Sequence, residues 1–93
     1  LTETLNKMVP FFSEHTYFML LCHEQRDYTV FRLSSAEKEK NAIQDLKECL
    51  TNRGEILSIE KENINNAYEI WIRSEGSIYV YYLFPYDEAI IEC

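Results

Sequence analysis

EILSIEKENINNAYEIWIRSEGSIYVYYLF, residues 55–84, predicts three consecutive strands of an antiparallel sheet. β-Branched and aromatic residues are frequent, and polar and apolar residues alternate over much of the segment. We expect the strands at Glu55–Glu60, Tyr68–Arg73 and Ser77–Phe84. Asn63-Ile64-Asn65-Asn66 and Ser74-Glu75-Gly76 have the composition of turns, and such short connections favour antiparallel neighbours. The segment therefore predicts a three-stranded meander.

The first third of the chain predicts a short helix followed by a hairpin. Thr2 can cap a helix that Pro10 would end or bend. Two runs of strand length follow, Thr16–Cys22 and Asp27–Leu33, and the polar segment His23–Arg26 separates them as a loop. These residues add one helix and two strands.

A second helix is predicted between the hairpin and the meander. Ser34-Ser35-Ala36-Glu37 fits a capping box, in which a serine oxygen and the glutamate satisfy free backbone N–H groups. Gly54 supplies the left-handed residue that ends the helix. The apolar positions between these ends recur at helical spacing: Ala42, Ile43, Leu46, Cys49 and Leu50.

The predicted fold is a single α+β domain, residues 1–93, with the order α-β-β-α-β-β-β. About five antiparallel strands form its sheet, and the helices pack mainly on one face. On that face we expect Tyr68, Ile70, Ile72, Ile78, Val80, Tyr82 and Phe84. The other face would carry Trp71, Tyr79, Tyr81 and Leu83. So much apolar area would need a cover, either the first helix or a second copy in a homodimer.

Composition restricts the class of protein and its partners. The net charge is −7, and residues 55–93 hold eight acids against only Lys61 and Arg73. That excess of negative charge disfavours direct binding of nucleic acid or of an anionic membrane. There is neither an apolar run long enough to span a bilayer nor a signal peptide, and the three cysteines are odd in number and widely spaced. We therefore expect a cytoplasmic protein with reduced thiols.

The residues that could support catalysis or bind a metal are few. Cys22 and His23 are adjacent on a predicted strand and so point to opposite faces, which separates thiol from base. Asp87-Glu88 lacks the ordered oxygen ligands of a calcium loop, and only two glycines are present to cradle a phosphate. We expect neither an enzyme nor a cofactor or metal site. A small hydrolase or thiol enzyme that uses Cys22 is the remaining alternative, after the two binding functions considered below.

The acids after Gly54 are the candidate partner-binding residues. Glu60 and Glu62 are two apart and would place carboxylates about 6.5–7 Å apart on one face of a strand, a spacing comparable to that of successive phosphates. The candidate phosphate mimics are Glu60, Glu62, Glu69, Glu75, Asp87, Glu88 and Glu92. The alternatives are a solvated acidic face and a protein-interaction module that uses the aromatic sheet face around Trp71.

Two segments, LTETLNKMVPFFSEHTYFML at residues 1–20 and IWIRSEGSIYVYYLFPYDEAIIEC at residues 70–93, together with size and acidity, resemble the Arn family of T-even phage anti-restriction proteins. That resemblance implies a DNA mimic, acting in the host cytoplasm as a homodimer. It also implies that the partner is the restriction endonuclease McrBC or the nucleoid protein H-NS. The residues of the mimic surface come from the charge pattern and not from the family.

Overall fold

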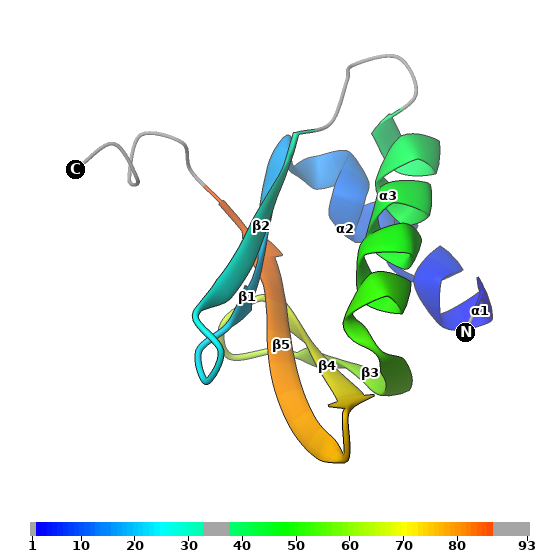
Figure 1. The fold of residues 1–93 in the computed structure, drawn as a ribbon. Coiled ribbons are helices and arrows are strands. Elements are labelled where there is room, and N and C mark those ends of the chain that lie inside the picture. The colour runs from blue at the N-terminus through cyan, green and yellow to red at the C-terminus, as the bar shows by residue number, and fades with distance from the viewer. Residues whose placement is uncertain (1, 33–37, 87–93) are drawn as a thin grey trace.

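The computed structural model describes residues 2–32 and 38–86, which form one sheet and one layer of helices. The helices are α1 (Thr2–Asn6), α2 (Val9–Glu14) and α3 (Lys38–Arg53). The strands are β1 (Tyr17–Cys22), β2 (Asp27–Arg32), β3 (Glu55–Glu62), β4 (Ala67–Ser74) and β5 (Ser77–Pro85). Figure 1 shows these elements along the chain. The predicted α+β class is confirmed, with a five-stranded antiparallel sheet.

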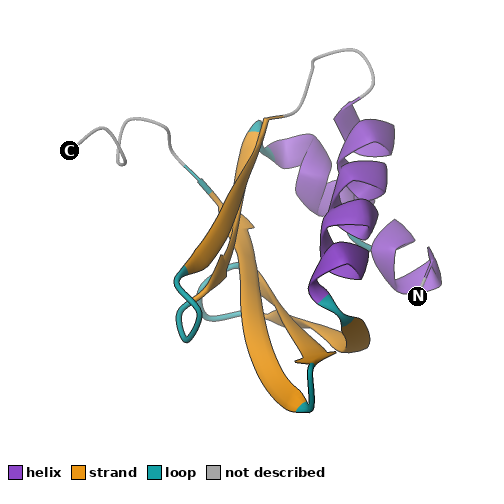
Figure 2. Ribbon diagram, viewed as in Figure 1, coloured by secondary structure: helices purple, strands orange, loops and turns teal. Residues whose placement is uncertain are grey.

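The sheet has the strand order β2-β1-β5-β4-β3, and all neighbours are antiparallel. β5 therefore lies at the centre, between β1 of the first hairpin and β4 of the meander. All described helices lie on one side of the strongly twisted sheet, as Figure 2 shows. None of the helices within the described residues is long and apolar enough to cross a membrane.

The core lies between this helical layer and the sheet. α3 contributes Ala42, Leu46 and Leu50, which are buried as the helical spacing predicted. The rings of Phe11 and Phe12 on α2 pack against Phe18 of β1, with centroids 5.0 Å apart in both pairs. Such tilted and edge-on ring contacts are favourable beyond the apolar area that they bury.

Gly54 ends α3 as predicted, with φ at +143°. The position also needs glycine for space, because a Cβ there would overlap the carbonyl oxygen of Arg73 on β4. The chain can therefore turn from helix into β3 beside the sheet only with a bare Cα. The predicted capping box at residues 34–37 lies outside the described residues, as do Leu33 and the segment 87–93.

The N-terminal helix differs from the prediction. Two short helices, α1 and α2, replace the single helix, and Pro10 lies in the first turn of α2 instead of ending α1. Proline is tolerated there because a first-turn N–H has no partner within the helix. The first helix was also one predicted cover for the far face of the sheet. It lies on the same side as α3, so that interpretation was wrong.

The face assignment of β5 was also wrong. Ile72 pairs with Tyr79 and Ile70 with Tyr81, so the odd-numbered residues of β5 face the helices. Tyr81 and Leu83 are 2% and 0% exposed and belong to the core, and Tyr79 packs against it. These three residues cannot form an exposed dimer face with Trp71. The even-numbered residues that were expected in the core lie on the far side: Ile78, Val80, Tyr82 and Phe84.

Candidate partner-binding face

The side of the sheet turned away from the helices carries both charge and apolar surface. We call it the open face, because no described helix covers it. Strand pairing places these residues on it: Glu55, Ser58, Glu60 and Glu62 of β3, Ala67, Glu69, Trp71 and Arg73 of β4, Ile78, Val80, Tyr82 and Phe84 of β5, Tyr17, Met19 and Leu21 of β1, and Tyr28, Val30 and Arg32 of β2.

Three of the predicted phosphate mimics come together at one end of the open face. Glu60 of β3 is directly opposite Glu69 of β4, and Glu62 follows two residues later on the same side of β3. Cross-strand neighbours have Cβ atoms about 4.5–5.5 Å apart, so Glu60 and Glu69 form a close pair of like charges. We call Glu60, Glu62 and Glu69 the acidic cluster.

Neutral donors hold two of these carboxylates in place. Trp71 donates its indole N–H to Glu69 at 2.6 Å, and the side-chain amide of Asn65 donates to Glu62 at 2.7 Å. Among the described residues, no lysine or arginine forms an ion pair with the acidic cluster. Arg73 pairs with Glu55 and Arg53 with Asp27, so neither of these arginines pairs with the cluster.

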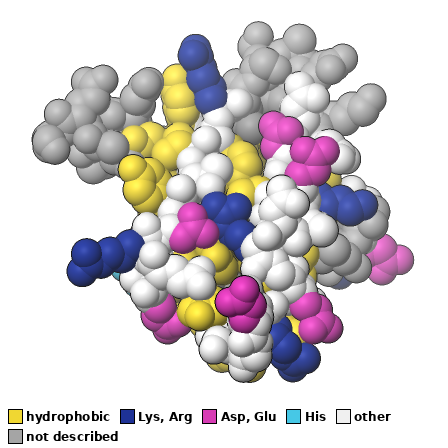
Figure 3. Space-filling model, in the orientation of Figure 1, with side chains coloured by type: hydrophobic (Ala, Val, Ile, Leu, Met, Phe, Trp, Pro, Cys, Tyr) yellow, Lys and Arg dark blue, Asp and Glu magenta, His cyan; other side chains and the backbone are white. Residues whose placement is uncertain are grey.

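The remaining predicted acids do not extend this cluster. Glu75 lies in the β4–β5 turn, six residues along β4 from Glu69, which corresponds to about 20 Å. Asp87, Glu88 and Glu92 lie outside the described residues. On the side of the molecule shown in Figure 3, acidic and basic side chains are intermingled and do not form a surface of one sign. The described acids therefore provide a local cluster and not a long strip.

Exposed apolar side chains occur at two other places on the open face, on the edge strand β2 and near the β4–β5 turn, where Arg73 pairs with Ile78. Tyr28 is 60% exposed, Val30 40%, Trp71 39% and Ile78 48%. Trp71 is on this face as predicted, but its cross-strand neighbour is Val80 and not one of the odd-numbered residues of β5. Exposed apolar side chains gathered on one side of a sheet are typical of surfaces that bind another protein.

Next to the acidic cluster, a groove of about 780 Å³ crosses the open face. Leu21 of β1 and Tyr82 and Phe84 of β5 line it, and the β3–β4 hairpin adds Glu62, Asn65 and Asn66. His15 and His23, from the two ends of β1, also line it. The groove was not predicted, because it depends on how the twisted sheet brings this hairpin near β1. Its volume lies within the usual range of ligand sites.

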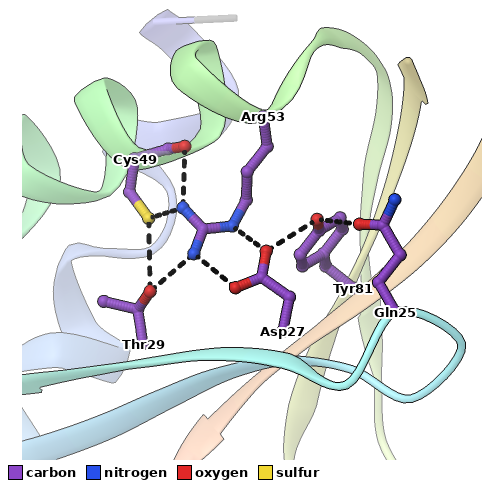
Figure 4. Close-up of polar contacts among 6 residues, drawn as sticks. All are labelled: Gln25, Asp27, Thr29, Cys49, Arg53 and Tyr81. Atoms are coloured by element: carbon purple, nitrogen blue, oxygen red, sulfur yellow. Dashed lines mark hydrogen bonds and ion pairs between the residues drawn. The ribbon is translucent and has the colours of Figure 1, made fainter. Parts of the chain in front are cut away.

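A second group of polar residues, shown in Figure 4, joins the end of α3 to the first hairpin. Arg53 donates two hydrogen bonds to the carboxylate of Asp27, at 2.9 and 3.1 Å, and another to the hydroxyl of Thr29 at 2.6 Å. It also donates to the carbonyl and sulfur of Cys49. The hydroxyl of Tyr81 contacts Asp27 at 3.1 Å. Every member has a partner within the group, so this arrangement is structural.

The ionisation of this group supports the same conclusion. Burial lowers the pKa of Arg53, but the hydrogen bond and charge of Asp27 outweigh it and the net pKa is raised. Burial and the hydrogen bond with Asp27 raise the pKa of Tyr81 to about 12. Arg53 is therefore charged and Tyr81 neutral near neutral pH. Neither is poised to exchange a proton there.

The cysteines do not form a site with the histidines in the described chain. Cys22 is buried in the core and Cys49 is half-buried on α3, and both are free thiols. His23 lies exposed in the turn after β1, on the open side, with its ring 6.4 Å from that of Tyr82. Within residues 2–32 and 38–86, no group of three His, Cys, Asp or Glu side chains could hold a metal ion.

Comparison with protein-family models, curated proteins and solved structures found no match.

Proposed function

We propose that this protein is a non-enzymatic inhibitor whose acidic cluster occupies the cationic DNA-binding surface of another protein. The observation that supports the proposal is the cross-strand opposition of Glu60 and Glu69, with Glu62 beside them and no described cation paired to any of the three. This arrangement presents fixed negative charges that lysine and arginine side chains of a partner can neutralise.

The repulsion between Glu60 and Glu69 also supports the proposal that the acidic cluster binds a cationic partner. Like charges directly opposite each other destabilise an antiparallel pair, by a fraction of a kcal/mol up to about 1 kcal/mol. Lys61 lies next to Glu60 in sequence, but its side chain points to the other side of β3 because neighbouring strand residues alternate. A cationic partner would relieve a repulsion that the protein itself leaves uncompensated.

The resemblance to the Arn family suggests which partners to test first, the restriction endonuclease McrBC and the nucleoid protein H-NS. It also suggests a homodimer in the host cytoplasm. Two copies related by a twofold axis would present the cluster twice and so extend a charged surface that is local in one chain. Analytical ultracentrifugation at several protein concentrations tests the dimer separately from the inhibition.

Displacement of a fluorescent DNA duplex from purified H-NS or McrBC tests the proposal. We expect the protein to compete with DNA, because the same cationic side chains cannot bind both, and we expect affinity to fall steeply with added salt. A ternary complex that also contains DNA, or binding insensitive to salt, would contradict the proposal.

A matched pair of triple variants separates the cluster from net charge. Glu60→Gln/Glu62→Gln/Glu69→Gln should abolish competition. The control changes three exposed acids away from the open face, Glu3→Gln, Asp45→Asn and Glu48→Gln, and removes the same charge. Equal losses in the two variants would show that overall charge alone drives binding.

A second candidate function is a protein-interaction module that binds through apolar contacts. The exposure of Trp71, Ile78, Val30 and Tyr28 on the open face favours it. Under this alternative, Trp71→Ala abolishes partner binding, whereas charge reversal at Glu60 and Glu62 leaves affinity nearly unchanged. The acidic-cluster proposal instead requires charge reversal at Glu60 and Glu62 to abolish partner binding.

A further inference from the structure

The groove on the open face differs from the acidic cluster in combining aromatic rings with a single charge. Tyr82 and Phe84 are two apart on β5, so both rings lie on the open side, about 6.5–7 Å apart at the backbone. Leu21, the cross-strand neighbour of Tyr82 on β1, adds an aliphatic wall. This lining suits the flat or apolar part of a ligand.

The β3–β4 hairpin supplies the polar rim. Among the described residues that line the groove, Glu62 is the only acidic one, no lysine or arginine is present, and His15 and His23 are the basic side chains. One carboxylate oxygen of Glu62 accepts a hydrogen bond from Asn65, and the carboxylate has further capacity to accept. The side-chain carbonyls of Asn65 and Asn66 add neutral acceptors. The groove is therefore complementary to a cation with several N–H donors.

We infer that the groove binds an arginine side chain of a basic partner protein. This inference rests on the proposed function and specifies which residue type of the cationic partner is recognised. A guanidinium group is planar, stacks on aromatic rings and donates through a fork of N–H groups, so Tyr82 or Phe84 can contact its face while Glu62 accepts from its edge. A lysine ammonium is more strongly hydrated and lacks the flat face, so the groove should discriminate against it.

The size of the groove is consistent with a side chain presented by a peptide segment. At about 780 Å³ it can hold an arginine together with the flanking backbone. Glu60 and Glu69 lie next to Glu62, so neighbouring cations of the same segment would meet the acidic cluster. The groove would thus provide specificity for arginine, and the adjacent acidic cluster would attract cationic side chains in general.

Direct titration with short peptides tests the inference without the unidentified partner. The probes are acetyl-Gly-Arg-Gly-amide, its lysine analogue and its citrulline analogue, followed by amide chemical shifts of the ¹⁵N-labelled full chain. The arginine peptide should cause saturable shifts at Asn65, Asn66 and Tyr82, and bind at least fivefold more tightly than the lysine peptide. The uncharged citrulline peptide should be weaker still.

Matched substitutions locate the binding. Tyr82→Leu should weaken arginine binding about tenfold by removing the ring face. Tyr28→Leu, the same change at an exposed site on the open face outside the groove, should change it less than twofold. If Tyr82→Leu does not fold, Glu62→Gln in the exposed hairpin replaces it, with Glu75→Gln in the other hairpin turn as its control. Only the first of these two should weaken binding.

Three results would overturn the inference: no saturable shift, shifts outside the groove, or equal affinity for the arginine and lysine peptides. The outcome is also separable from the proposed function. Arginine binding in a protein that fails to displace DNA from a cationic domain would support the groove and reject the proposed inhibition. Displacement without arginine selectivity would support the inhibition and reject the groove.

Discussion

Replacing Asp27 with asparagine removes the charge opposite Arg53 and leaves the guanidinium in a half-buried site. The Arg53 side chain is 17% exposed and that of Asp27 36%, with the closest nitrogen–oxygen distance 2.9 Å. Breaking a fully buried pair costs about 3–5 kcal/mol, and an exposed pair contributes about 0–1 kcal/mol. The intermediate burial here leads us to expect a loss of about 2 kcal/mol in the free energy of unfolding. For a domain of this size that corresponds to a fall in Tm of about 10 °C.

Urea denaturation followed by far-UV circular dichroism at neutral pH measures the loss. The matched control is Glu55→Gln, which breaks the pair with Arg73 at 3.4 Å, where both side chains are more than half exposed. We expect that control to lose less than about 0.5 kcal/mol. If Asp27→Asn costs no more than Glu55→Gln, the contacts around Arg53 do not stabilise the junction between α3 and the first hairpin.

Three further substitutions test other parts of the structure. Because the pKa of Tyr81 is raised to about 12, its contribution to the free energy of unfolding should be fully present below pH 10 and should fall as the pH rises towards 12. Tyr81→Phe should flatten this pH dependence, measured as the midpoint of denaturant unfolding. Gly54→Ala should cost about 2–4 kcal/mol, measured by thermal unfolding, since it combines a positive φ with an overlap against backbone. Glu60→Gln should stabilise the chain by about 0.2–1 kcal/mol at low salt by relieving repulsion with Glu69, and the gain should shrink with salt. An unchanged or lower midpoint for Glu60→Gln would show that the two carboxylates do not repel.

The elements that the sequence predicted well are those whose residue pattern is compatible with only one secondary structure and one buried face. The apolar spacing of α3 and the glycine after it left little choice, and the helix ends at Arg53. β5 was different, because SIYVYYLF is apolar on both sides and its pattern cannot select a face. The length of the turn between β4 and β5 decides which residues of β5 face the core. A three-residue turn at Ser74-Glu75-Gly76 would pair Ile72 with Ile78, whereas in the structure Ser74 pairs with Ser77 and Ile72 with Tyr79.

That one-residue difference was visible in the sequence. Glu75-Gly76 forms a two-residue turn with both φ values positive, +51° and +82°, the conformation typical of tight hairpins. Counting back from such a turn would have placed Tyr79, Tyr81 and Leu83 in the core. The contact of Arg53 with Asp27 had no comparable signal, because the residues are 26 apart and meet only when α3 packs over β2. The groove likewise depends on the twist of the whole sheet.

The correction to β5 also changes how the candidate functions compete. With Tyr81 and Leu83 in the core, the open face keeps Trp71 beside Glu69, and the indole N–H is bound to that carboxylate. The charged and apolar parts of the face are therefore joined by a hydrogen bond, so Trp71→Ala removes apolar area and also frees Glu69. A Trp71→Phe variant separates the two effects, since it keeps the ring and loses the donor. If phenylalanine preserves partner binding and alanine does not, the apolar contact of the ring determines binding. If both substitutions weaken binding equally, the hydrogen bond that positions Glu69 determines it.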